Sequence, residues 1–133
     1  MKTYERVLLD THAYIWLVSD PDRLSTTAYE AVIDIDTEVF VSAASLWEIS
    51  TKARLSKLPG GGTLAATFED RTRLHVLERL PMDFNHSRLA GELDWDHRDP
   101  FDRMLAAQSM LENLPLVTKD SRLQAYESIH TIW

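Results

Sequence analysis

Short apolar runs that alternate with helical segments constrain the fold of this chain more than any other feature of its sequence. The clearest apolar runs are Val7-Leu8-Leu9, Val39-Phe40-Val41 and residues 114–118. Segments with helical apolar spacing or helix-capping residues separate them. Strands joined through helices pair in parallel, with the helices covering both faces of the sheet. The sequence therefore predicts an α/β fold, a three-layer α/β/α arrangement around a central, mainly parallel sheet.

Capping residues and apolar spacing place the helices between these strands. Ser25 is a predicted cap for a helix from Thr26 to Ile35, and Asp99 caps a helix that starts at Pro100 and runs to Leu111. A further helix has apolar residues at Leu46, Ile49 and Ala53, at i, i+3 and i+7. The remaining predicted elements are helices at 11–17, 63–75 and 85–93, and strands at 76–80 and 129–133.

Length and composition indicate one ordinary domain covering residues 1–133. A chain of 133 residues buries enough surface to fold without a covalent staple, and this one has no cysteine for disulfides or thiolate metal sites. It contains no stretch of about 18 apolar residues that would span a bilayer, and no signal-peptide pattern. We therefore expect a cytoplasmic protein without membrane contact.

The net charge of −7 argues against a simple nucleic-acid-binding module, because such modules are usually basic. The acidity is partly concentrated at a few positions. Setting aside Asp10, Glu48, Asp99, Asp102 and Asp120 leaves 16 acidic residues against 14 lysines and arginines. Bound divalent cations would reverse the sign of the charge around those five acids.

These five acids all lie near predicted strand ends or helix starts. Asp10 directly follows the first strand, and Asp120 lies two residues after the strand that ends at Thr118. Glu48 is in the first turns of the helix after the second strand, while Asp99 and Asp102 open the helix before residues 114–118. In an open parallel sheet, ligands bind beyond the carboxyl ends of the strands. We therefore expect the acids to meet at one edge of the sheet.

Each acid also has a purely structural explanation. Glu48 fits either a capping box with Ser45 or an i,i+4 ion pair with Lys52. The others fit helix caps or first-turn acids that complement the helix dipole: Asp10, Asp99, Asp102 and Asp120. These local explanations leave the coincidence of all five at one edge unexplained.

Such a cluster needs cations or protons. Two carboxylates about 4 Å apart repel by roughly 4 kcal/mol at an effective dielectric constant near 20. Oxygen ligands without cysteine or a paired-histidine motif favour Mg²⁺ or Mn²⁺ over zinc. One or two such ions suit hydrolysis of a phosphodiester bond, because the cation activates water and stabilises charge on the phosphate.

Four segments resemble the motifs of PIN domains in order and spacing along nearly the whole chain. They are residues 7–12 (VLLDTH), 45–49 (SLWEI), 98–108 (RDPFDRMLAAQ) and 116–120 (LVTKD). The third segment is the most telling and is similar to that of VapC-like toxins. One small departure is Ser56 before Lys57, where relatives often have glycine, and it affects a loop only.

The resemblance implies a PIN fold and an endoribonuclease that depends on one or two Mg²⁺ or Mn²⁺ ions. It also implies a homodimer that a cognate VapB-like antitoxin inhibits. By this resemblance Asp10, Glu48 and Asp102 form the core metal site, Asp120 completes it, and Asp99 is an additional candidate ligand. The alternatives are a PIN-type nuclease that acts on DNA and a PIN-like binding module without catalysis.

Residues beside the acids are candidates for contact with RNA. Thr11 and Thr118 carry hydroxyls that can orient carboxylates or water, and Arg103 and Lys119 carry charges that can meet phosphates. For His12 and His97, substrate contact or packing is favoured over catalysis, because no nucleophile pattern accompanies them. The four tryptophans are interpreted as core or interface residues rather than base-stacking platforms: Trp16, Trp47, Trp95 and Trp133.

Overall fold

The computed structural model describes residues 3–133, and its strands form one sheet in which all neighbours run parallel. The strands are β1 (Arg6–Leu9), β2 (Glu38–Ser42), β3 (Glu78–Leu80), β4 (Leu116–Val117) and β5 (Thr131–Ile132). They lie in the order β3-β2-β1-β4-β5. The register pairs Leu9 with Val41 on one side and with Val117 on the other. The predicted parallel sheet is confirmed.

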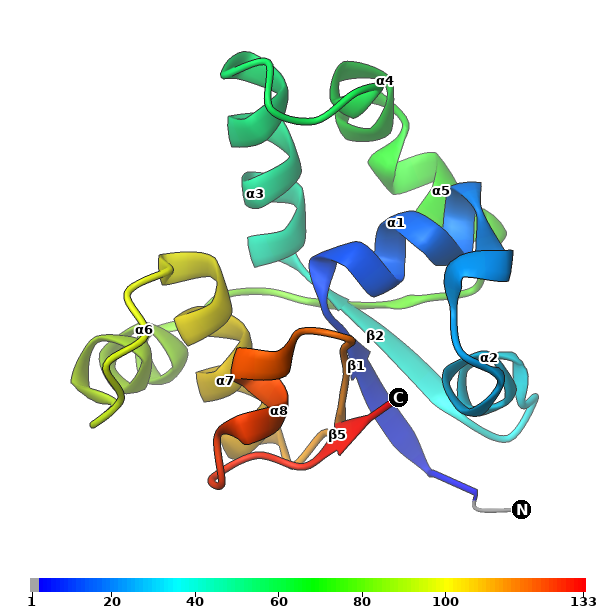
Figure 1. The fold of residues 1–133 in the computed structure, drawn as a ribbon. Helices are drawn as coiled ribbons and strands as arrows, with labels where there is room; N and C mark the ends of the chain where they lie inside the picture. The colour runs from blue at the N-terminus through cyan, green and yellow to red at the C-terminus, as the bar shows by residue number, and fades with distance from the viewer. Residues whose placement is uncertain (1–2) are drawn as a thin grey trace.

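Helices cover both faces of this sheet, which gives the predicted three layers (Figure 1). One side carries α1 (Thr11–Ser19), a 3-10 turn (Pro21–Arg23), α2 (Thr26–Ile33), α3 (Ala43–Arg54), α4 (Gly61–Ala66) and α5 (Phe68–Leu74). The other side carries α6 (Phe84–Glu92), α7 (Pro100–Glu112) and α8 (Ser121–Ala125). No helix within residues 3–133 is long and apolar enough to cross a membrane.

Alternation along the central strand divides the core into two clusters. Val7 and Leu9 of β1 pack in the cluster shared with α1, α2 and α3, whereas Leu8 packs with Leu105 and Leu116. The side chains of Val7, Leu8 and Leu9 are all fully buried. Because successive side chains of a strand point to opposite faces, a continuous apolar run such as 7–9 is what a central strand covered on both faces requires.

The predicted helix at 63–75 is wrong in one respect, because the segment forms two helices that break at Thr67. The Thr67 hydroxyl donates to the carbonyl oxygen of Thr63 at 2.7 Å. A hydroxyl that bonds to the carbonyl four residues earlier competes with the helical backbone and bends the helix. The break lets Phe68 turn inward, where its ring lies 4.5 Å from that of Tyr14 between centroids.

The order of the strands places a topological switch point at the carboxyl edge of the sheet. The strands β2 and β3 follow β1 on one side of it, and β4 and β5 lie on its other side. The direction of winding thus reverses between β1 and β4, and ligands of open α/β sheets bind at such a switch point. The residues that directly follow β1 and β4 therefore define the candidate site.

Candidate active site

Asp10 and Asp120 lie on either side of this switch point. Asp10 follows β1 and caps α1, where its Oδ1 accepts the backbone N–H of Ala13 at 2.8 Å. Asp120 follows β4 and caps α8 through the N–H groups of Arg122 and Leu123. Both predicted helix caps are confirmed. The carboxylates are close enough for the charge of Asp120 to raise the pKa of Asp10.

Thr118 connects these two acids. Its hydroxyl is fully buried, accepts the backbone N–H of Asp120 at 3.0 Å and hydrogen-bonds to the carboxyl group of Asp10. One side chain at the end of β4 therefore orients both acids. The predicted role of the Thr118 hydroxyl in orienting carboxylates is consistent with these contacts.

Glu48 reaches the site from α3. The helix starts at Ala43 with Ser42 as its cap, so the predicted capping box between Ser45 and Glu48 is wrong. Ser45 lies inside the helix, and its hydroxyl is 3.0 Å from that of Thr11. The alternative is confirmed instead, because the Lys52 ammonium lies 2.5 Å from the Glu48 carboxylate, one helical turn away.

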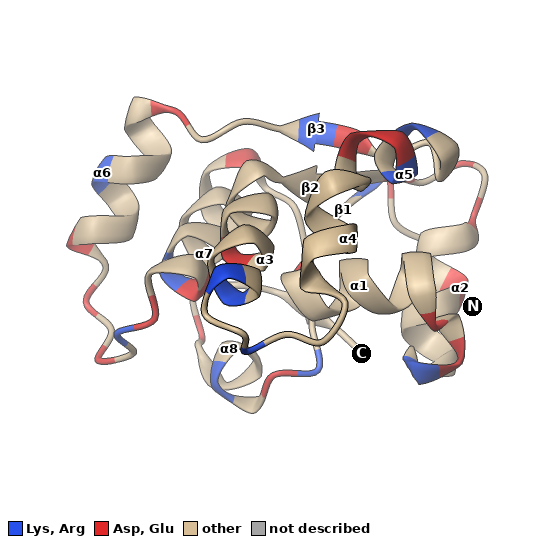
Figure 2. Cartoon of the chain, turned by 90° about the horizontal axis from the view of Figure 1, so that it is seen from above, with Lys and Arg blue, Asp and Glu red and all other residues tan. Residues whose placement is uncertain are grey.

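Asp99 and Asp102 enter from the start of α7, which packs beside α3 (Figure 2). Asp99 is the predicted cap, and its Oδ1 accepts the N–H groups of Phe101 and Asp102. The carboxyl group of Asp102 shares a hydrogen bond of 2.7 Å with Nε2 of His97. The charges of Asp99 and Asp120 both raise the pKa of Asp102.

Burial of these acids shifts their titration towards neutral pH. Burial, together with the charges of Glu48 and Asp120, raises the pKa of Asp10 to about 6, against the lowering effect of the hydrogen bonds from Thr118 and Ala13. Burial likewise raises the pKa of Asp102 to about 6, against the hydrogen bond from His97. Glu48 is only 4% exposed. Such clustered, buried acids are typical of functional sites.

The chemistry of this donor set fits a hard divalent cation. Asp10, Glu48, Asp102 and Asp120 supply carboxylate oxygens from four different elements, and oxygen donors of this kind suit Mg²⁺ and Mn²⁺. Their mutual repulsion is what a bound cation would remove. In the structure Glu48 is turned to Lys52 and Asp102 to His97, so two of the four carboxylates contact a neighbouring base.

His97 is a neighbour that the sequence reasoning did not assign to Asp102. It lies in the loop before α7 and is 7% exposed. Its Nδ1 is buried and lacks a hydrogen-bond partner among residues 3–133. The closeness of His97 to the third motif was visible in the sequence, but its contact depends on the path of the loop. The structure identifies His97 as a residue that positions Asp102.

Arg103 has a different environment from the one its predicted RNA contact requires. Its guanidinium donates to carbonyl oxygens at the end of α6 and in the loop between α6 and α7, with distances from 2.7 to 3.5 Å. The acceptors are the carbonyls of Ala90, Gly91, Leu93, Trp95 and His97. These bonds hold the loop that carries His97, which is a structural role. Contact of Arg103 with RNA stays a prediction.

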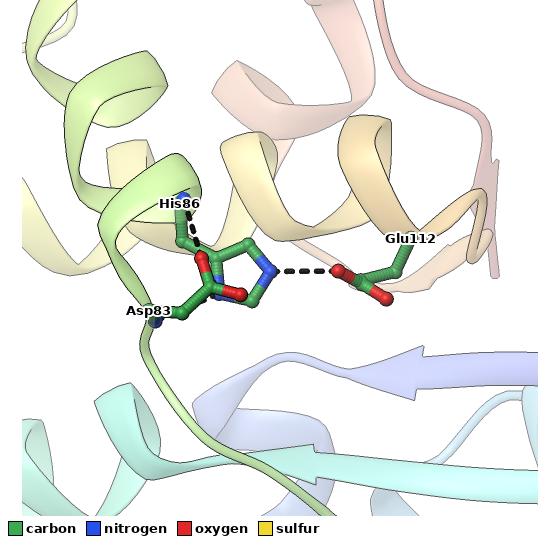
Figure 3. A group of neighbouring side chains, drawn as sticks. All are labelled: Asp83, His86 and Glu112. Carbon is green, nitrogen blue, oxygen red and sulfur yellow. Dashed lines mark hydrogen bonds and ion pairs between the residues drawn. The ribbon is translucent and has the colours of Figure 1, made fainter.

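A second group of side chains meets the distance criterion for metal ligands more closely than the four acids do. Within residues 3–133, this group consists of Asp83, His86 and Glu112, whose potential ligand atoms all lie within 4.8 Å of one another. Figure 3 shows Asp83 and Glu112 on opposite sides of the His86 ring. Nε2 of His86 lies 2.8 Å from Glu112, and Nδ1 accepts the backbone N–H of Asp83.

These contacts satisfy both nitrogens of His86 without an ion. Asp83 and His86 form a capping box at the start of α6, and Glu112 ends α7. Glu112 lies ten residues after Asp102, about 15 Å along the helix at 1.5 Å per residue. The group thus joins α6 to the far end of α7, and we interpret it as a structural clasp.

Fold and acids together define an α/β/α protein with a carboxylate centre at the switch point of a parallel sheet. The profile of the PIN domain family matches residues 7–128. The chain therefore belongs to the PIN domain family.

Individual proteins resemble the chain over nearly its full length. Ribonuclease VapC22 of Mycobacterium tuberculosis (strain ATCC 25618 / H37Rv) is 28% identical, covering 96% of this chain and 98% of that protein. A chain in the crystal structure of VapBC2 from Rickettsia felis bound to a DNA fragment from their promoter has a TM-score of 0.69 and 15% identity, covering 95% and 96%. A chain in the crystal structure of DNA-bound VapBC from Salmonella typhimurium has a TM-score of 0.67 and 18% identity, covering 96% of this chain and 97% of that chain. These structural neighbours confirm the PIN-like fold.

Proposed function

We propose that this chain is a Mg²⁺- or Mn²⁺-dependent endoribonuclease and the toxin of a VapBC-type toxin–antitoxin pair. The observation that carries the proposal is the convergence of four acids from different elements at the switch point of a PIN domain. The similarity to a relative named a ribonuclease supports RNA as the substrate. The VapBC complexes among the structural neighbours support an antitoxin as the partner.

The proposed metal ligands are Asp10, Glu48 and Asp102, with Asp120 completing the set and Asp99 as an additional candidate. A cation bound there would supply an activated water and charge stabilisation for the scissile phosphate. Thr118 holds Asp10 and Asp120 in place, and His97 does the same for Asp102. Lys52 neutralises part of the charge at Glu48. No side chain in this set is proposed as a covalent nucleophile.

The antitoxin surface is proposed on the early helices. Tyr29 and Ile33 of α2 are both exposed, and they line a cavity of about 540 Å³ with Pro21 and Leu24. Exposed apolar residues around a cavity are typical of protein interfaces. A single domain over residues 1–133, a homodimer and a cytoplasmic location complete the proposal.

Cleavage of matched RNA and DNA tests the proposal. The purified protein is incubated with a tRNA and ribosomal RNA pool, and with single- and double-stranded DNA, in Mg²⁺, Mn²⁺ or EDTA. We expect discrete RNA fragments in either metal, none in EDTA and no cleavage of DNA. Cleavage of DNA alone would indicate the DNA-directed alternative. Absence of cleavage on every substrate in both metals would favour a binding module.

A further inference from the structure

A small cavity opens directly beside the proposed metal ligands. It has a volume of about 310 Å³ and is lined by Asp10, His12, Trp16, Lys119 and Asp120. Ligand cavities range from about 300 to 1,000 Å³, so this one suits a ligand of mononucleotide size rather than a larger one. Two of its lining residues are proposed metal ligands, and the other three have no role in holding the metal.

Trp16 supplies an aromatic wall of this cavity. The side chain is half-buried and packs against the core cluster of α1 and β1. Its ring lies 5.7 Å from that of His12 and 5.8 Å from that of Trp133, between centroids. His12 is exposed, one turn earlier on α1. The ring is thus anchored by packing while it still lines an open cavity.

Lys119 supplies the cation of the cavity. The side chain is exposed and, within residues 3–133, has no carboxylate within 4.0 Å of its ammonium group. The Nζ atom lies 5.9 Å from the centroid of the Trp16 ring, and the Arg23 guanidinium lies 4.9 Å from it. Because no carboxylate is paired with it, the Lys119 ammonium group is available to contact an anionic ligand.

We propose that this cavity binds one nucleotide of single-stranded RNA next to the cleaved phosphodiester. The base of this nucleotide stacks on the aromatic wall formed by His12 and Trp16, and its phosphate contacts Lys119. A base inside a duplex cannot reach an aromatic wall, so the cavity selects single strands or loops. The inference rests on the proposed nuclease function and names a substrate subsite within it.

The test separates stacking from charge by the salt dependence of RNA binding. Fluorescein-labelled single-stranded RNA is titrated in excess Mg²⁺ with protein carrying Asp102→Asn, in which cleavage is too slow to consume the RNA during the titration. Trp16→Leu, Trp16→Phe, Lys119→Ala and Lys119→Arg are added to this background. Arg88→Ala is the matched control, because Arg88 is an exposed cation on α6. Far-UV circular dichroism and melting temperature establish that each variant is folded.

Two different signatures are expected. Trp16→Leu weakens binding about 10-fold without changing the slope of log K against log salt, since it removes a stacking surface and no charge. Lys119→Ala reduces the magnitude of that slope by about 0.7, the value for one phosphate contact on a single strand. Trp16→Phe and Lys119→Arg retain most of the affinity, and Arg88→Ala leaves affinity and slope unchanged.

Failure of the subsite and failure of the nuclease function give different results. If wild-type protein cleaves RNA but Trp16→Leu and Lys119→Ala bind it like the parent, the subsite is wrong and the nuclease function stands. If the two variants instead lose only binding of a protein partner, the cavity belongs to a protein interface, which also overturns the inference. If RNA binds with the expected signatures and wild-type protein cleaves none, the subsite stands without the nuclease function.

Discussion

Replacing Asp10 by Asn is expected to stabilise the metal-free protein at pH 8 by roughly 1–3 kcal/mol and to abolish cleavage. The carboxyl group is 5% exposed, and burial raises its pKa from 3.8 to about 6. A shift of about two units corresponds to about 3 kcal/mol between the two protonation states. Asn is neutral and caps a helix as well as Asp does, so the bond to the Ala13 N–H is kept.

The sign of the pH dependence follows from the raised pKa. The folded protein holds the Asp10 proton more tightly than the unfolded chain does, so stability from this group is fully present below about pH 4. It is lost as the pH rises through about 6. The Asn variant lacks this loss. Its free energy of unfolding should therefore exceed that of wild type by an amount that grows between about pH 4 and pH 7.

Urea unfolding in EDTA at pH 4.5, 6 and 8 measures this advantage. Comparing the two proteins at each pH cancels the titration of the other acids to first order. Thr118→Val serves as a second variant, because it removes the hydroxyl that hydrogen-bonds to Asp10 and should enlarge the loss of stability and extend it to higher pH. An advantage that is constant with pH, or an Asn variant less stable than wild type at pH 8, would contradict the burial of an ionised Asp10.

Asp102→Asn is expected to reduce the rate of RNA cleavage by more than about 100-fold, whereas Asp99→Asn reduces it much less. Loss of a residue that only supports a metal ligand costs about 10- to 100-fold, so loss of a ligand itself should exceed that range. The two acids lie on the same helical turn, and Asn preserves the cap that Asp99 forms with Phe101 and Asp102. The pair therefore separates metal binding from capping.

Initial rates at saturating Mg²⁺ and again at limiting Mg²⁺ provide the comparison. A defect of Asp102→Asn that excess metal restores would assign the loss to affinity for the cation. Equal losses for both variants would place Asp99 among the ligands. If Asp102→Asn were fully active at limiting Mg²⁺, the proposed ligand set would be wrong.

The order of the elements and the site edge could be predicted because both depend on local patterns. Strand runs such as 7–9 are continuous and apolar, and acids at strand ends are brought together by parallel pairing whatever the details of packing. The caps at Asp10, Asp99 and Asp120 follow from the sequence for the same reason. Each depends on residues within three positions of the cap.

The side-chain partners were not predictable, because they depend on loops and on residues far apart in the sequence. His86 meets Glu112 across 26 residues, and Arg103 reaches back to Ala90 through a loop with no periodic pattern. The start of α3 at Ala43 rather than after Ser45 depended on which of two serines, Ser42 or Ser45, acts as the cap. Trp16 shows the same limit: its packing was expected, but its place in the wall of a cavity required the tertiary structure.

Binding of Mn²⁺, followed by the loss of the free-ion signal in electron paramagnetic resonance, tests the central claim most directly. The chain holds two candidate groups, the acids at the switch point and the Asp83, His86 and Glu112 clasp. Wild type, Asp102→Asn and Glu112→Gln are titrated side by side at pH 8. We predict that wild type and Glu112→Gln bind one or two ions per chain and that Asp102→Asn loses most of this binding. Binding that survives Asp102→Asn and disappears with Glu112→Gln would contradict the account, because it would move the metal to the clasp.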